Sequence, residues 1–200
     1  MAASGIAANP CAGVLALQGD FALHLNALER RGIGSRAVRR PAQLEGLAGL
    51  VLPGGESSVM WRLIRSEGLE PALGSFVQSG KPVLGTCAGM ILLAQEVVSP
   101  EQGCLGRLGI TVERNGYGRQ LCSAVYELSG QNGFPDCRGV FIRAPRILSI
   151  RAPVEVLATY QETPVLVRDG PVFASCFHPE LSEGHALIDT FVDAVRSRAS

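Results

Sequence analysis

The chain has 200 residues, with 18 lysine and arginine residues balanced by 18 aspartate and glutamate residues. This length suits one domain with a substantial core, and a neutral chain without a basic tract argues against nucleic acid or an anionic membrane as a partner. Gly, Pro, Thr or Gln interrupts every apolar stretch well before the about 20 residues that a transmembrane helix needs, so we expect no membrane span.

Cysteine usage and the start of the chain indicate the compartment. The six cysteines form no C-x-x-C pair and no zinc-finger spacing, so we expect free thiols, no metal and a reduced, cytoplasmic location. Residues 1–9 lack the charged and apolar regions of a secretory signal. We expect residues 1–12 to form a loose segment and residues 13–200 to form a single domain.

The first half of the chain alternates strand-like and helix-like patterns. Apolar runs predict strands at Gly13–Leu17, Arg36–Val38, Leu47–Leu52 and Pro82–Leu84, and helical spacing predicts helices at Phe21–Arg31, around Val59–Ile64, at about Pro71–Ser79 and after Cys87. Such alternation implies right-handed crossovers and a mostly parallel sheet with helices on both faces, a three-layer α/β fold.

The second half is less regular. From about Gln95 to Pro145, short apolar pieces among glycines predict an insertion of small, partly antiparallel strands. Strands are then predicted at Val154–Tyr160, Pro164–Arg168 and Val172–Phe177, with Asp169-Gly170 as a hairpin turn. An apolar face along His185–Arg198 predicts a closing helix on the sheet.

Three loops follow predicted strands and should meet at one edge of the sheet. They contain Gln18-Gly19, Gly54-Gly55 and Cys87. In open α/β sheets ligands bind beyond the carboxyl ends of the strands. We therefore expect the functional site at this edge.

Cys87 lies in Gly85-Thr86-Cys87-Ala88-Gly89, between a predicted strand and a predicted helix. This is the layout of a nucleophile elbow, in which small flanking residues allow a strained turn that exposes the central side chain. The start of the helix would also favour the reactive thiolate. The alternative is a small buried cysteine in a tight turn.

A cysteine nucleophile needs a base, and the base needs an orienting group. His178 follows a predicted strand in Phe177-His178-Pro179-Glu180, and Glu180 can fold back to bond one imidazole nitrogen while the other faces Cys87. The alternative is a histidine bonded to a turn carbonyl, with Glu180 a surface acid. His24 and His185 fall within or near helices and are weaker candidates for the base.

A tetrahedral intermediate also needs oxyanion donors. Ala88 can offer its backbone N–H directly after the nucleophile, and the Gly54-Gly55 loop can offer a second one. A tight strand-to-helix turn would need the same glycines without any such role.

Together, Pro53-Gly54-Gly55-Glu56-Ser57, the Cys87 elbow and Phe177-His178-Pro179-Glu180-Leu181 resemble the class I, triad-type glutamine amidotransferases, which have a flavodoxin-like fold. More narrowly, the chain is similar to the glutaminase subunits of pyridoxal 5′-phosphate synthase. That similarity also rests on Gly13–Gly19, Val112–Gln120 and Val140–Pro145, and it covers nearly the whole chain.

The resemblance implies that Cys87 is the nucleophile, His178 the general base and acid, and Glu180 its orienter. It implies a glutamine site at Gly55, Glu56, Ser57, Arg114, Ile142 and Arg143, with Gly55 and Ala88 as oxyanion donors. Arginines suit the α-carboxylate of free glutamine, although both could instead form surface ion pairs.

The resemblance further implies hydrolysis of L-glutamine to glutamate and ammonia. The ammonia would pass to a separate synthase subunit, a barrel enzyme that makes pyridoxal 5′-phosphate, and this chain would itself carry no cofactor. Three alternatives remain: a glutaminase of another pathway such as histidine biosynthesis, a cysteine hydrolase of the same fold acting on other amides or esters, and a binding subunit with an idle triad.

Overall fold

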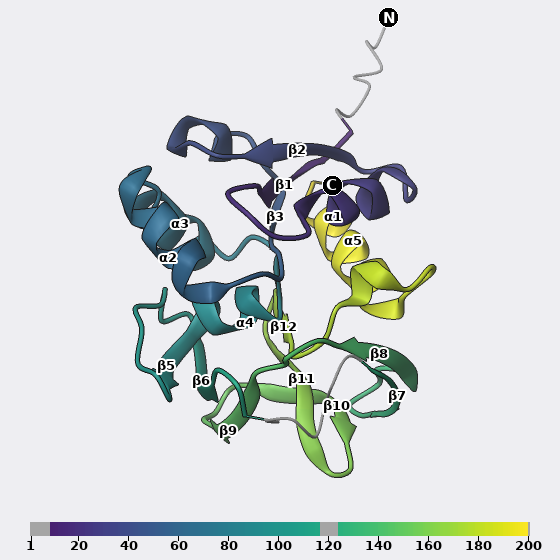
Figure 1. Cartoon of the computed structure of the whole chain (residues 1–200). Helices are drawn as coiled ribbons and strands as arrows, with labels where there is room; N and C mark the ends of the chain where they lie inside the picture. The colour runs from purple at the N-terminus through teal and green to yellow at the C-terminus, as the bar shows by residue number, and fades with distance from the viewer. Residues whose placement is uncertain (1–8, 117–123, 200) are drawn as a thin grey trace, which may run out of the picture.

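A nine-stranded mixed sheet runs through the middle of the molecule in the order β2-β1-β3-β4-β12-β11-β10-β7-β8 (Figure 1). The computed structural model describes residues 9–116 and 124–199. The strands of this sheet are β1 (Cys11–Leu15), β2 (Gly34–Val38), β3 (Gly49–Leu52), β4 (Val83–Thr86), β7 (Ala124–Gly130), β8 (Cys137–Phe141), β10 (Glu155–Tyr160), β11 (Thr163–Asp169) and β12 (Val172–Ser175).

The strands from β2 to β12 in this order pair in parallel, as the alternating pattern predicted. Every residue of β3, β4 and β12 is buried. Strands buried on both faces are expected to be largely apolar, as these are up to the polar residues Thr86 and Ser175 at the ends of β4 and β12. The first strand begins at Cys11 rather than at Gly13, and Ala12 is already fully buried.

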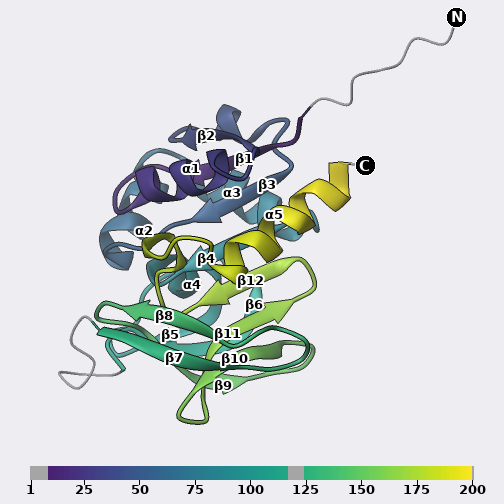
Figure 2. The same cartoon turned by 90° about the vertical axis from the view of Figure 1, so that its right-hand side faces the viewer.

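Helices cover both faces of the parallel strands (Figures 1 and 2). One face carries α1 (Phe21–Glu29) and α5 (Ala186–Ala199), and the other carries α2 (Ser57–Ser66), α3 (Glu70–Gln78) and α4 (Ala88–Leu93). Two short 3-10 helices, η1 (Pro41–Leu44) and η3 (Pro179–Leu181), lie in connections. The predicted three-layer α/β fold and each of its helices are thus confirmed, with small shifts at their ends.

The segment from Gln95 to Pro145 forms small strands as predicted, but these strands belong to two different sheets. A second, three-stranded sheet contains β5 (Ala94–Val98), β6 (Leu108–Glu113) and the unpredicted β9 (Arg146–Ile150). In contrast, β7 and β8 extend the main sheet, because β7 pairs with β10. Residues 117–123, which include Cys122 and the end of the Val112–Gln120 motif, lie outside the described residues.

The strands beyond β12 are antiparallel. β11 and β12 pair from Asp169 opposite Val172, and Gly170 in the turn has a φ of +55°. The hairpin predicted at Asp169-Gly170 is therefore confirmed. A left-handed backbone at this position favours glycine, which is the physical reason that the Asp-Gly signal was informative.

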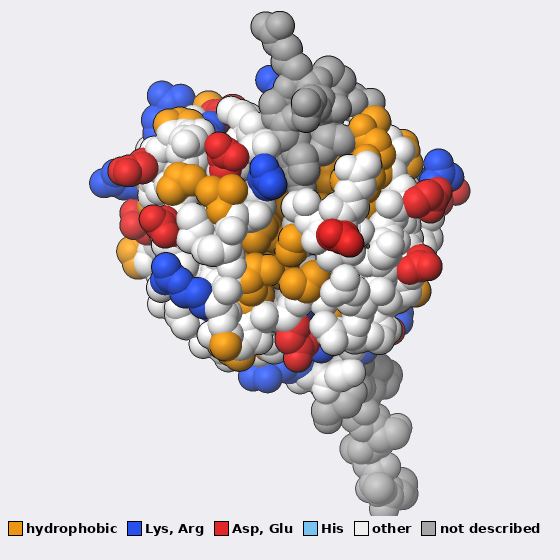
Figure 3. Space-filling model, turned by 90° about the horizontal axis from the view of Figure 1, so that it is seen from below, with side chains coloured by type: hydrophobic (Ala, Val, Ile, Leu, Met, Phe, Trp, Pro, Cys, Tyr) orange, Lys and Arg blue, Asp and Glu red, His pale blue; other side chains and the backbone are white. Residues whose placement is uncertain are grey.

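Figure 3 shows the face that lies at the bottom of the molecule in Figure 1. Hydrophobic side chains gather in the middle of this face, with basic and acidic side chains around them. On β9, Leu148 is 50% exposed. Within residues 9–116 and 124–199, none of the helices combines the length and apolar character that crossing a bilayer requires.

Candidate active site

Four neighbouring parallel strands end at one edge of the sheet, and the loops that follow them meet there. The loops after β1, β3 and β4 contain Gln18-Gly19, Gly54-Gly55 and Cys87, and the loop after β12 contains His178. A pocket of about 360 Å³ opens between them. It is lined by Asp20, Gly55, Glu56, Ser57, Cys87, Ile91, Arg114, Asn115, Ile142, Arg143 and His178.

This lining contains every predicted site residue except Glu180 and Ala88. Glu180 lies behind His178, and Ala88 is the buried first residue of α4, directly after the nucleophile candidate. The strand-end argument therefore located the pocket correctly. Arg114 follows β6, and Ile142 and Arg143 follow β8, so the irregular segment supplies one wall of the pocket.

Cys87 occupies a sharp turn between β4 and α4. Its φ is +49°, a left-handed conformation that is unfavourable for a residue with a side chain. Its backbone N–H donates to the carbonyl of Ser175 at 2.8 Å, which joins the turn to the end of β12. Cys87 is only 6% exposed as a residue, yet it borders the pocket.

The two glycines of the elbow are required by close packing. A Cβ at Gly89 would lie 1.9 Å from the carbonyl oxygen of Leu52, and a Cβ at Gly85 would lie 2.6 Å from the side chain of Leu93. Helix α4 therefore approaches β3 and β4 more closely than any residue with a side chain would allow. This is the geometry that the Gly-x-Cys-x-Gly pattern predicted.

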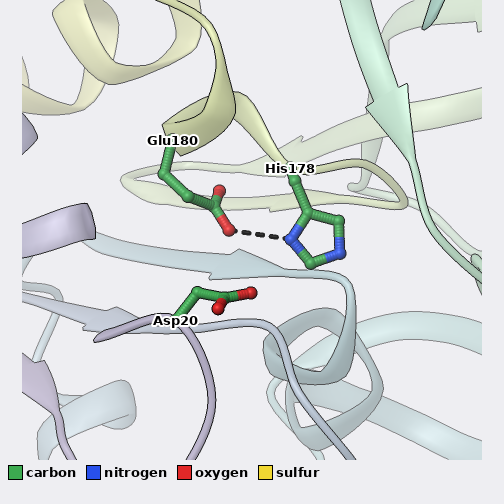
Figure 4. Close-up of side chains that lie close together, drawn as sticks. All are labelled: Asp20, His178 and Glu180. Atoms are coloured by element: carbon green, nitrogen blue, oxygen red, sulfur yellow. Dashed lines mark hydrogen bonds and ion pairs between the residues drawn. The ribbon is translucent and has the colours of Figure 1, made fainter. Parts of the chain in front are cut away.

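His178 and Glu180 form a buried pair (Figure 4). The distance from Nδ1 of His178 to Oε1 of Glu180 is 2.8 Å, and the two residues are 3% and 9% exposed. The alternatives of a turn carbonyl as partner and a surface carboxylate are thus wrong. Since a carboxylate can only accept, Nδ1 of His178 is the donor, and Nε2 is the nitrogen available to Cys87.

The environment shifts both groups toward their charged forms. Burial by itself would lower the pKa of His178, but hydrogen bonds to Cys87 and Glu180 outweigh it and raise the pKa to about 10. Burial likewise opposes ionisation of Glu180, but His24 and His178 lower the pKa of this carboxyl to about 2. At neutral pH His178 is therefore an imidazolium between Cys87 and Glu180, ready to donate a proton.

The Gly54-Gly55 loop is held tightly between its neighbours. A Cβ at Gly54 would lie 2.4 Å from Cε1 of His178, and Gly55 has a φ of +142° that requires glycine. Nε2 of Gln18 donates to the carbonyl of Glu56 at 2.9 Å. A Cβ at Gly19 would lie 2.0 Å from the carbonyl oxygen of Gly54, so the β1 loop packs directly on this loop.

Glu56 and Arg114 form the charged side of the pocket. The Glu56 carboxylate caps α2 by accepting from the N–H groups of Ser58 and Val59, and it binds Nη2 of Arg114 at 2.6 Å. Although burial acts in the opposite direction, these donors lower the pKa of Glu56. Arg114 does form the ion pair that composition allowed, but it does so inside the pocket, where the pair orients its guanidinium.

Two other residues of the predicted glutamine site, Arg143 and Ser57, also border the pocket. Arg143 is exposed, with a left-handed φ of +44°, directly after Ile142 at the pocket wall. The Ser57 hydroxyl donates to Oε1 of Gln102 at 2.9 Å, so its orientation is fixed by a residue from the segment between β5 and β6.

Sequence reasoning missed Asp20. Asp20 is the N-cap of α1, but its side chain makes no cap hydrogen bond, and its carboxylate lies with His178 and Glu180 (Figure 4). Among the described residues these three form the one group of at least three His, Cys, Asp or Glu whose candidate ligand atoms all lie within 4.8 Å. The sequence signal that could have identified Asp20 is its position directly after Gln18-Gly19, in a loop already expected at this edge of the sheet.

Comparison with known proteins is consistent with this geometry. Residues 14–197 match the model of the SNO glutamine amidotransferase family. The chain is 48% identical to the pyridoxal 5′-phosphate synthase subunit PdxT of Geobacillus kaustophilus and 46% identical to that of Bacillus mycoides, in each case over 92% of this chain and 94% of the relative.

Solved structures agree. A crystal structure of a glutamine amidotransferase is 47% identical, with a TM-score of 0.86 over 92% of this chain and 98% of its own. The structure of PurLQS from Thermotoga maritima, at 20% identity and a TM-score of 0.70 over 94% and 98% of the two chains, shares the fold. The strand order, the elbow at Cys87 and these matches together establish that the chain belongs to the SNO glutamine amidotransferase family.

Proposed function

We propose that this protein is the glutaminase subunit of a pyridoxal 5′-phosphate synthase, and that it hydrolyses L-glutamine with a Cys87-His178-Glu180 triad. The observation that carries the proposal is the arrangement at the sheet edge. A strained cysteine, a buried imidazole bonded to a carboxylate, and an arginine border one pocket large enough for an amino acid.

The residues supply each step of the reaction. The Cys87 thiolate attacks the side-chain amide carbon, and the carbonyl oxygen becomes an oxyanion that the N–H groups of Ala88 and Gly55 stabilise. The carbon–nitrogen bond breaks as Nε2 of His178 transfers its proton to the nitrogen, which leaves as ammonia. A water molecule then gives a proton to Nε2 and attacks the thioester, so that the carbon–sulfur bond breaks and glutamate is released.

Glutamine is recognised by the walls that the irregular segment supplies. The guanidinium groups of Arg114 and Arg143 suit the α-carboxylate, because an arginine can bind a carboxylate through two parallel hydrogen bonds. Gly55, Glu56, Ser57 and Ile142 complete the site along the length of the substrate. Arg114 is already oriented by Glu56, which reduces the entropy that binding must overcome.

The ammonia passes to a partner synthase subunit. The names of the two bacterial relatives support this, since both are subunits of pyridoxal 5′-phosphate synthase. The synthase supplies the vitamin chemistry, and this chain carries no cofactor of its own. A cytoplasmic location is supported by the free thiols Cys11, Cys87, Cys104, Cys137 and Cys176.

The test is glutamate release from glutamine by the wild type and by Cys87→Ala, each with and without the synthase subunit. We expect activity that requires both Cys87 and the synthase, with a loss of at least about 10³-fold in the variant. Activity that requires Cys87 but ignores this synthase would indicate another pathway. Cleavage of other amides or esters in place of glutamine would favour the general cysteine hydrolase, and no reaction would favour an idle triad.

A further inference from the structure

His24 lies behind the triad, on the buried face of α1 beside Ala27 and Leu28. It is 2% exposed and does not border the pocket. Its Nε2 lies 3.3 Å from Oε2 of Glu180 and 3.2 Å from the hydroxyl oxygen of Thr86. The carboxylate that orients His178 is therefore flanked by two buried imidazoles, one at each oxygen.

The hydrogen on His24 follows from this arrangement. A carboxylate only accepts hydrogen bonds, so Nε2 of His24 must carry a hydrogen where it faces Glu180. The Thr86 hydroxyl oxygen can share that hydrogen, because a hydroxyl accepts as well as donates. Thr86 directly precedes Cys87, so His24 connects the strand that carries the nucleophile with the acid that orients the base.

Glu180 depends on this contact. Within the described part of the chain, Oε2 of Glu180 has no hydrogen bond of standard geometry, and its side chain is fully buried. The 3.3 Å approach of His24 is thus the interaction that compensates for removing this oxygen from water. An unpaired buried charge is unfavourable, so without His24 the carboxylate would protonate more readily or turn away from His178.

We infer that His24 is a positioning residue of the catalytic site, which holds Glu180 ionised and aligned on His178 and so extends the triad to a fourth, non-contacting member. The inference rests on the proposed glutaminase activity. His24 acts through Glu180 and touches neither the pocket nor the nucleophile, so its loss should lower kcat and leave the KM for glutamine nearly unchanged.

Other charged groups near this cluster leave the direction of the effect clear. Asp20 lies at the start of α1 near His178 and Glu180. On the outer side of Glu180, Arg31 pairs with Asp189 and Arg30 pairs with Glu183, and His185 also interacts electrostatically with Glu180. These groups stay in place when His24 is replaced. Thr86, from β4, is uncharged. Loss of His24 removes the imidazole that faces Oε2 and leaves His178 as the imidazole that stabilises the ionised carboxylate, so the acid limb of the pH profile moves to higher pH.

The experiment compares His24→Leu, His24→Gln and the wild type in the assembled complex with the synthase. Active sites are counted by stoichiometric labelling of Cys87 with a glutamine-mimicking chloroketone, and kcat, KM and the pH dependence of kcat/KM are measured per labelled site. The control is His185→Leu, which removes a similarly buried histidine that bonds Arg138 and the start of α5. The pH dependence of Cys87 alkylation by iodoacetamide, read on its own peptide, is recorded in parallel.

We expect kcat of His24→Leu to fall about ten- to hundredfold, the range for one interaction with a charged group, with the acid limb shifted upward. His24→Gln, whose amide can replace the Nε2 donor, should recover most of the loss. His185 interacts with Glu180 electrostatically and hydrogen-bonds Arg138 and Leu187 instead, so His185→Leu should lose stability and shift the acid limb less than His24→Leu does. A wild-type pH profile in His24→Leu, or the same kcat loss in His185→Leu, would overturn the inference.

Two further results separate the possible failures. If the wild type releases no glutamate, the proposed function fails, and the alkylation profile alone then decides whether His24 supports the Cys87–His178 pair. If His24→Leu does not fold, His24→Asn takes its place, because its shorter amide cannot span the gap to Glu180. An unchanged alkylation profile in that variant would equally contradict the inference.

Discussion

The parallel half of the molecule, from β2 to β12, and its irregular and antiparallel half, which includes the second sheet, contribute differently to the site. The parallel half, from β2 to β12, carries the cysteine, the histidine and the glycine loop at its strand ends, all tightly packed. The irregular and antiparallel half contributes Arg114, Ile142 and Arg143 from the loops after β6 and β8. Under the proposed function, chemistry is thus placed on the rigid strand ends, and substrate recognition on loops from another part of the chain.

This division follows from physical requirements. Bond making needs atoms held within fractions of an ångström, which a buried parallel sheet provides. Binding a flexible amino acid requires less precise placement, so a long side chain can serve. Arg114 is such a side chain, and its ion pair with Glu56 holds it at the pocket. Substitutions in the parallel half should therefore affect kcat, and substitutions in the other half should affect KM.

The largest effect is expected from Glu180→Gln. Loss of the carboxylate removes the acceptor that orients Nδ1 of His178, so kcat should fall about 10³-fold while KM changes little. Steady-state kinetics of the complex measures this. A variant with normal kcat and a raised KM would contradict the assignment of the parallel half to chemistry.

The same pair should make stability depend on pH. The pKa of Glu180 is lowered from 4.5 to about 2, so its contribution is present above pH 4.5 and is lost as the pH falls toward 2. The pKa of His178 is raised from 6.5 to about 10, so its contribution is present below pH 6.5 and is lost as the pH rises toward 10. Urea unfolding should show the largest difference between wild type and Glu180→Gln, on the order of 3 kcal/mol, between about pH 4.5 and 6.5.

Gly54→Ala should come next. Its Cβ would lie 2.4 Å from the His178 ring, so the ring or the loop must move, and we expect kcat to fall about a hundredfold. The matched control is Gly74→Ala in α3, where a Cβ would meet no described heavy atom within 4 Å. That substitution should leave kcat unchanged and stabilise the helix by about 1 kcal/mol. Equal kinetics for the two variants would refute the close packing of the loop on the base.

Arg114→Ala tests the other half. It removes a guanidinium from the proposed α-carboxylate site, so KM should rise about tenfold or more with a smaller change in kcat. Arg168→Ala is the control. It also removes an arginine from an ion pair with a glutamate, but the pair joins Arg168 on β11 to Glu155 on β10 and does not border the pocket. If kcat fell in Arg114→Ala while KM held, the division between the two halves would be wrong.

The smallest effect is expected at the surface of the second sheet. Leu148 is half exposed on β9, so Leu148→Ser removes little buried area and should change the free energy of unfolding by no more than about 0.5 kcal/mol. Thermal unfolding measures this, and we expect the midpoint of the variant to lie within a few degrees of that of the wild type. A loss of several kcal/mol would show that this side chain is covered in the folded protein.

Most of the parallel half could be predicted from the sequence. Its strands β3, β4 and β12 are buried on both faces and are mostly apolar, and β1, β3 and β4 are each followed by a turn and a helix. Parallel strands joined by right-handed crossovers must bring their carboxyl ends together. The convergence of Gly54-Gly55, Cys87 and His178 follows from that rule, as does the pocket at their edge.

The sequence alone determined which residues stand at the strand ends and which of them can carry chemistry, because these features depend on local patterns and on the rules of parallel sheets. The tertiary structure decided which strands the irregular segment joins, because pairing such as that of β7 with β10 depends on hydrogen bonds between distant residues. It also decided where the side chains of Asp20 and His24 lie. The sequence indicates only that His24 lies within a helix. Its approach to Glu180 arises from the packing of α1 against η3.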